Sequence, residues 1–209
     1  MRTTLLLLAF CTFNSAIDPG LSGDNVISCE TYSYRQLFLA GTLNVMDVPE
    51  LYKKDGIKGI SFNERYFEAR DNAYIDRLKA AVKKAGRVVV ALQVDGDLAT
   101  SDEAKRRAQI EHDKESIRIA HRLGAPIVRI NTGGVSRREN VDESIGAQRV
   151  IAAFNEMLPL ARELKVKIAI ENHGGASKTA DGILSIIKGT DPKWVGALLD
   201  LGNFDRETI

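Results

Sequence analysis

The sequence has little cysteine and almost no net charge. Its two cysteines are Cys11 and Cys29. If Cys11 is removed with the N-terminal segment described next, the single remaining thiol cannot form an internal disulfide. The fold must then rest on its apolar core, in which we expect Cys29 to be a small buried residue. The formal net charge of +1 provides no sequence-wide attraction to nucleic acid or acidic lipid.

The sequence also lacks an apolar run long enough to cross a membrane. The run at residues 5–10 is far shorter than the roughly 20 residues that a transmembrane helix needs. Arg2 precedes it and small residues up to Ala16 follow it, a pattern typical of a secretory signal peptide. We therefore expect residues 1–16 to be a signal peptide and the protein to be exported (periplasmic or secreted), with no membrane attachment afterwards. The alternative is a buried N-terminal strand or a misassigned start, in a cytoplasmic protein.

No antiparallel hairpin signal interrupts residues 17–209, which alternate between short β-rich runs and longer helical patterns. Strands are expected at residues 26–29, 59–62, 88–92, 127–130, 167–170 and 195–199. Helices are expected at residues 47–55, 75–85, 102–123, 140–164 and 183–187, with another opening at residues 205–207. Asp47 is expected to cap the first helix, and Asn140 and Glu143 suggest the start of the fourth. His112 and His121 lie on the third helix, and we expect both on the outer surface.

Six βα units in series predict an α/β fold with a parallel sheet. A doubly wound sheet would be complete with six strands, but it usually has a glycine-rich turn after its first strand, and none follows Cys29. An eight-stranded (β/α)8 barrel needs about 250 residues, and this chain has 209. We therefore favour an incomplete barrel with about six units present and an unpaired edge where a seventh strand would dock.

Polar residues gather where three consecutive strands end, which is where active sites of such barrels lie. The fourth strand ends with Arg129 and Asn131, the fifth with Glu171 and His173, and the sixth with Asp200 and Asn203. Glu171 and Asp200 are about one βα unit apart, so neighbouring strands would present two carboxylates at one rim. The structural alternative is that each carboxylate caps a following helix or pairs with Arg129.

Two carboxylates with a nearby imidazole suit a divalent ion such as Mg, Mn, Zn or Co, and the sequence does not choose among them. Such an ion polarises a carbonyl or hydroxyl oxygen, and a carboxylate beside it can move a proton as a general base. This combination is well suited to isomerising or epimerising a sugar at the carbon next to its carbonyl.

Two segments carry a resemblance to a known family. Residues 168–175 (IAIENHGG) and 195–204 (VGALLDLGNF) resemble the strand-five and strand-six segments of the xylose isomerase-like TIM-barrel family of sugar phosphate isomerases and epimerases, and residues 123–129 resemble the stretch that enters its strand four. The likeness runs from about residue 26 to the end.

The resemblance implies that Glu171 and Asp200 bind a divalent metal and that Glu171 also transfers the proton. The family completes this site with a histidine from strand seven and a glutamate from strand eight, which this chain does not contain. Asn203 stands where many members have a histidine that contacts substrate. We expect the substrate-binding residues to come from His173, Asn131, Asn203 and Arg129.

The sequence thus predicts a metal-dependent isomerase or epimerase of a sugar or sugar phosphate. Its partner would be a small sugar, with no nucleic acid, and an oligomer is possible. A catalytically inactive fragment or a non-catalytic carbohydrate-binding barrel is the alternative, because half of the expected metal ligands are missing. An endonuclease IV-like phosphodiesterase is disfavoured, because the net charge is only +1 and the chain has three histidines.

Overall fold

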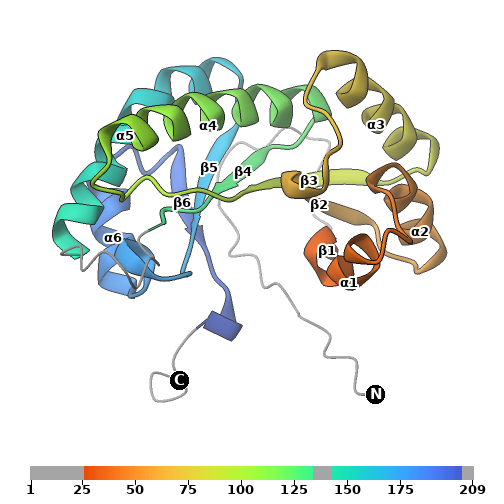
Figure 1. The fold of residues 1–209 in the computed structure, drawn as a ribbon, viewed down its shortest axis with the longest axis horizontal. Helices are drawn as coiled ribbons and strands as arrows, with labels where there is room; N and C mark the ends of the chain where they lie inside the picture. Colours follow the sequence, from red (N-terminus) through yellow and green to blue (C-terminus); the bar gives the residue numbers. More distant parts are fainter. Residues whose placement is uncertain (1–25, 134–142, 204–209) are drawn as a thin grey trace.

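The computed structural model describes residues 26–133 and 143–203, and Figure 1 shows the arrangement of their elements. Six strands form one sheet in the order β1-β2-β3-β4-β5-β6, and every neighbouring pair is parallel. The strands are β1 (Ser28–Glu30), β2 (Gly59–Asn63), β3 (Val88–Val94), β4 (Ile127–Ile130), β5 (Lys167–Glu171) and β6 (Val195–Leu198). The predicted α/β class is confirmed, and the barrel is not closed: within the described ranges, no strand pairs with the outer edge of β1 or β6.

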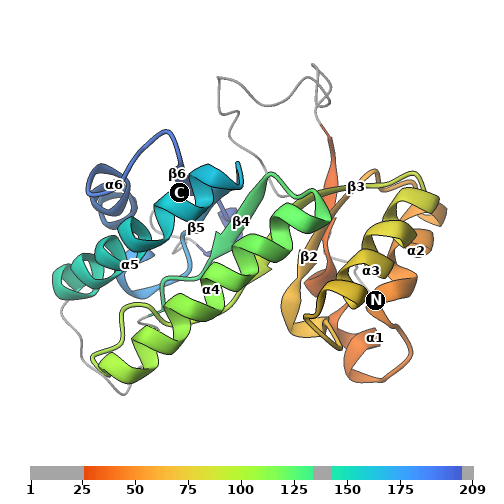
Figure 2. The same ribbon diagram turned by 90° about the horizontal axis from the view of Figure 1, so that it is seen from above.

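Helices connect the strands and lie along the outer side of the curved sheet (Figures 1 and 2). They are α1 (Arg35–Leu39), α2 (Val48–Lys54), α3 (Asn72–Lys84), α4 (Glu103–Leu123), α5 (Glu143–Glu163) and α6 (Ala180–Lys188). No helix in this described part of the chain is both long enough and apolar enough to span a membrane.

The two faces of the sheet differ in chemistry because successive side chains of a strand point to opposite sides. The residues that share the helix-facing side are apolar and belong to the core: Phe62, Leu92, Val128, Ile168 and Ile170. The alternate positions face the interior of the open barrel and are mostly polar: Ser61, Asn63, Gln93, Arg129 and Glu171. The helices therefore stabilise the sheet from outside, and the inner face is left for polar groups.

Local signals explain most helix ends. Asp71 caps α3 by accepting from the backbone N–H of Tyr74 (2.9 Å), and Asp102 caps α4 by accepting from that of Lys105 (3.1 Å). Gly124 ends α4 in a left-handed conformation (φ 83°), which costs glycine little. The two ends of α4 lie within about one residue of the expected positions, whereas α3 begins three residues before the expected Ile75.

The predicted cap at Asp47 is wrong. A short 3-10 turn, η3 (Val45–Asp47), precedes α2, and Asn44 caps it by accepting from the backbone N–H of Met46 (2.9 Å). Because Asp47 is already in a helical conformation, its side chain makes no capping hydrogen bond. Helix α1 was not expected, since five residues are too few to show a helical period.

Other element boundaries differ from the predicted ones. β1 begins at Ser28 and continues to Glu30, and β3 continues past Leu92 to Val94. Residues 1–16, Asn140 and residues 205–207 lie outside the described residues, so the signal peptide and the helix starts expected there stay predictions.

The two histidines of α4 have different environments. His121 is exposed, as predicted. His112 is also accessible at the surface, with 40% of its side chain exposed, but it lies 3.2 Å from Glu64, a contact that was not predicted. Glu64, in the loop after β2, is 7% exposed in its side chain and also contacts Arg70 (3.0 Å). This charge cluster joins the β2–α3 loop to α4.

Candidate functional site

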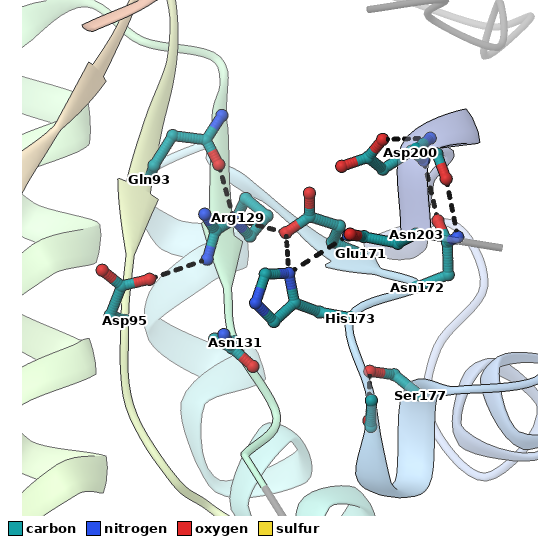
Figure 3. A network of polar contacts seen from close by, with 12 residues as sticks. Gln93, Asp95, Arg129, Asn131, Glu171, Asn172, His173, Ser177, Asp200 and Asn203 are labelled. Atoms are coloured by element: carbon teal, nitrogen blue, oxygen red, sulfur yellow. Dashed lines mark hydrogen bonds and ion pairs between the residues drawn. The ribbon is translucent and has the colours of Figure 1, made fainter. Parts of the chain in front are cut away.

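The carboxyl ends of β3 to β6 meet at one rim of the sheet, where the structure brings together five of the six predicted site residues (Figure 3). Glu171 is the last residue of β5 and Asp200 lies just beyond β6. The other three are Arg129, His173 and Asn203. Asn131 makes its hydrogen bond outside this group: its side-chain oxygen accepts from the backbone N–H of Gly133 (3.1 Å) in the loop after β4.

The guanidinium of Arg129 is buried and held firmly by protein groups. Arg129 is 4% exposed, and its Nε donates to Oε1 of Gln93 (2.6 Å). Gln93 is itself fixed, since its Nε2 donates to the hydroxyl of Ser61 (2.6 Å). The Nη1 of Arg129 donates to the carbonyl of Val94 (3.2 Å) and to Oδ1 of Asp95 (3.3 Å). These contacts place a rigid positive charge behind the rim.

Glu171 lies between the guanidinium of Arg129 and the imidazole of His173. Its Oε2 is 3.5 Å from Nε of Arg129 and 3.3 Å from Nδ1 of His173. This oxygen is fully buried and makes no well-aligned hydrogen bond in the described structure, only these charge contacts. Burial alone would raise the pKa of Glu171, but His173 and Arg129 outweigh it and hold the pKa below its ordinary value. The carboxylate is therefore ionised at neutral pH.

His173 has a partner for each of its protonation states. Its contact with Glu171 raises the pKa of the imidazole, and a protonated ring donates from Nδ1 to the Glu171 carboxylate. Nδ1 also lies 3.2 Å from Nδ2 of Asn203, from which a neutral ring protonated at Nε2 accepts. The side chain of His173 is 44% exposed, so the ring stands between the buried carboxylate and the solvent.

Asp200 approaches Glu171 from the neighbouring strand. Its Oδ1 accepts from the backbone N–H of Gly202 (2.7 Å) as the chain turns into η6 (Leu201–Asn203). Burial and the negative charge of Glu171 raise the pKa of Asp200. Figure 3 shows one oxygen of Glu171 directed at Arg129 and His173 and the other pointing toward the Asp200 side. The two carboxylates thus form a pair.

This pair fits part of a metal centre. Carboxylate oxygens are ligands that Mg, Mn and Zn accept, and one oxygen of Glu171 is turned toward Asp200, away from Arg129 and His173 (Figure 3). In residues 26–133 and 143–203, however, no group of three or more His, Cys, Asp or Glu side chains is arranged to hold a metal. A full ligand shell would need groups beyond this pair.

Several residues of the site were not found from the sequence. Gln93 directly follows the predicted third strand and Asp95 lies two residues further on, so both stand at a strand end to which no role was assigned. Asn172 lies within the resemblance segment but had no assigned role. Glu30 ends β1, accepts from Nδ2 of Asn63 (3.2 Å), and has a pKa raised by burial. Glu30 directly follows the predicted first strand, as Glu171 follows the predicted fifth, so the same strand-end criterion applied to the first strand would have found it.

Comparison with known proteins agrees with this arrangement. A family model described as xylose isomerase-like TIM barrel matches residues 49–207. No curated protein matches the chain.

Several solved structures share the fold. A D-psicose 3-epimerase with D-tagatose from Clostridium cellulolyticum H10 matches 80% of this chain and 62% of its own, at 15% identity and a TM-score of 0.68. The 3-keto-D-glucoside 4-epimerase YcjR from E. coli matches 74% and 62%, at 15% identity and a TM-score of 0.63. The IolI protein with a binding zinc atom matches 81% and 60%, at 17% identity and a TM-score of 0.65. The chain therefore spans less than two thirds of the length of these proteins, and at such identities the likeness concerns the fold alone.

Proposed function

The chain belongs to the xylose isomerase-like TIM-barrel family, and from this premise we propose that it isomerises or epimerises a sugar or sugar phosphate by moving a proton next to the carbonyl. The observation that carries the proposal is the pairing of Glu171 and Asp200 at the rim, with Arg129 and His173 against Glu171. Two neighbours in fold, a D-psicose 3-epimerase and a 3-keto-D-glucoside 4-epimerase, support the substrate class.

Glu171 is the proposed general base. Arg129 and His173 keep its carboxylate ionised, so it can accept the proton of a C–H bond next to a carbonyl and return it. Its position at the end of β5 places it at the rim, where substrates of parallel barrels bind. Arg129 contributes a fixed positive charge beside Glu171. That Arg129 and Asn131 contact the substrate stays a prediction.

Glu171 and Asp200 together would hold a divalent ion (Mg, Mn, Zn or Co). A bound ion of this kind polarises the substrate carbonyl and stabilises the negative charge that develops when the proton leaves. The zinc atom bound to the IolI protein, a neighbour in fold, supports this part of the proposal. His173 and Asn203, at the rim beside the carboxylates, are the proposed donors to substrate hydroxyl groups.

Calorimetric titration with Mn²⁺ tests the metal centre. We expect the wild-type protein to bind Mn²⁺ and Glu171→Gln to lose binding, because the amide removes a negative charge and a ligand oxygen. Glu163→Gln, an exposed change on α5, is the matched control and should bind as the wild type does. No binding by the wild type, or equal binding by Glu171→Gln, would contradict the proposed centre.

Solvent exchange tests the chemistry. The protein with Mn²⁺ is incubated with D-fructose or D-tagatose in D₂O, and deuterium at carbon is measured by mass spectrometry. Incorporation that depends on Glu171 supports proton transfer. Sugar binding without incorporation would favour the alternative of a non-catalytic carbohydrate-binding barrel, and neither binding nor incorporation with either sugar would favour an inactive fragment.

A further inference from the structure

Asn172 continues the pairing of β5 and β6 after their backbone ladder has ended. The last paired residues of the two strands are Glu171 and Leu198. Beyond them, Oδ1 of Asn172 accepts from the backbone N–H of Asp200 (2.7 Å), and its Nδ2 donates to the backbone carbonyl of Asp200 (2.8 Å). Asn172 is 2% exposed, so its side chain is locked among protein groups, as Figure 3 shows.

These two hydrogen bonds determine where the Asp200 carboxylate lies. A side-chain amide that binds both the N–H and the C=O of one residue fixes the orientation of both peptide groups, and hence the direction of the Cα–Cβ bond. The carboxylate is then fixed by the bond from Gly202 to its Oδ1 (2.7 Å). Without Asn172, Asp200 would lie two residues past β6 with its backbone N–H unpaired.

The same short segment therefore provides one carboxylate and positions the other. Glu171 and Asn172 are consecutive at the end of β5, so any movement of this segment carries both. We propose that Asn172 is a positioning residue, whose side-chain amide holds the Asp200 carboxylate beside Glu171 so that the two act as one pair of ligands. The role toward a metal rests on the proposed function, whereas the hold on Asp200 does not.

A purely structural asparagine would stabilise the fold without affecting the pair, and Asn155 offers the matched control. Its Nδ2 donates to the backbone carbonyl of Gly189 (3.1 Å) at the surface, between α5 and the end of α6. Asn155→Leu removes a hydrogen bond from side chain to backbone that lies away from the site.

The test compares Asn172→Leu and Asn172→Ser with Asn155→Leu. Leucine matches the size of asparagine and makes neither bond, and serine keeps a polar group but is too short to make both. Two quantities are measured: hydrogen exchange of the Asp200 amide by NMR, and Mn²⁺ affinity by calorimetry. In both Asn172 variants we expect the Asp200 amide to lose its protection and the Mn²⁺ affinity to fall about 10–100-fold, the usual effect of removing a group that orients a ligand. Asn155→Leu should change neither quantity.

The outcomes separate this proposal from the proposed function. An Asp200 amide that stays protected in Asn172→Leu, or a Mn²⁺ affinity that stays at the wild-type value, would overturn the positioning role. If the leucine variant does not fold, the serine variant decides. If the wild type binds no Mn²⁺, the metal centre fails, and the exchange of the Asp200 amide still shows whether Asn172 holds that residue.

Discussion

At the scale of single residues, one buried guanidinium acts on carboxylates at the ends of three strands. Arg129 contacts Asp95 (3.3 Å) and Glu171 (3.5 Å). It also lowers the pKa of Glu30, which burial otherwise raises. Because buried charges are costly unless they are paired, Arg129 allows several acidic side chains to lie together on the inner face of the sheet.

Removal of this charge should be far more damaging than removal of a surface arginine. We expect Arg129→Met to lower the free energy of unfolding by about 3–5 kcal/mol, since it removes the buried counter-ion of Glu171 and leaves that carboxylate only the half-exposed His173. Arg129→Lys should lose less, because it keeps the charge but not the planar fork that meets Gln93 and Val94. Urea denaturation measures the free energy of unfolding of both variants. Arg162→Met, which breaks an exposed pair with Asp191 (2.6 Å), is the control, and an equal loss in both Met variants would contradict the counter-ion role.

The main site residues could be predicted from the sequence because the rule that finds them is local. Glu171 and Asp200 follow apolar runs, and strand ends of parallel sheets meet at one rim. Gln93 and Asn172 could not be assigned in the same way, because their partners come from neighbouring strands. Only the register that places Gln93 opposite Arg129 creates the hydrogen bond between them, and a single sequence does not state the register.

At the scale of elements, helix ends that depend on nearby residues were predicted better than features that depend on other parts of the chain. The start of α4 near Asp102 was predicted, and the cap that Asp102 forms there depends on a residue only three positions away. The Asp47 cap failed because Asn44, with equal capping chemistry, begins a 3-10 turn just before it. Ion pairs between side chains of different helices, such as those between α4 and α5, depend on how the helices pack and could not be predicted from the sequence.

Glu156 on α5 illustrates such a pair and has a defined pH dependence. Its carboxylate accepts hydrogen bonds from Arg107 (2.8 Å) and Lys114 (2.8 Å) of α4, and these contacts lower its pKa to about 2. A lowered pKa stabilises the fold above the ordinary value of 4.5, and that stability is lost as the pH falls toward 2. Glu156→Gln should therefore cost up to about 1 kcal/mol at neutral pH, since the pair is partly exposed.

Urea denaturation between pH 7 and pH 2 measures this effect. The difference between the wild type and Glu156→Gln should shrink on acidification and at high salt, while Glu163→Gln, exposed on the same helix, should differ little from the wild type throughout. A difference that persists unchanged at pH 2 would show that Glu156 acts through packing and not through its charge.

At the scale of the whole molecule, the described strands form an open sheet with two edges. β6 pairs only with β5 within the described residues, and β1 only with β2. Apolar side chains lie beside both edges: Ile27 is 81% exposed and Leu201 is 53% exposed. The order of six parallel strands followed from the alternation of strand and helix patterns in the sequence. The unpaired edge expected beyond the sixth strand agrees with this open arrangement.

An open edge of this kind presents unpaired N–H and C=O groups to other chains. We expect the 209-residue chain to self-associate, with an apparent mass that rises with protein concentration in light scattering after size-exclusion chromatography. Ala197→Lys places a charge at an exposed position of β6 and should raise the concentration needed for association by roughly tenfold, because edge lysines oppose strand pairing. Ala104→Lys, at an exposed position of α4, adds the same charge away from the edge and should leave association unchanged. A wild-type protein that stays monomeric at all concentrations, or an equal effect of the two substitutions, would show that the β6 edge does not drive association.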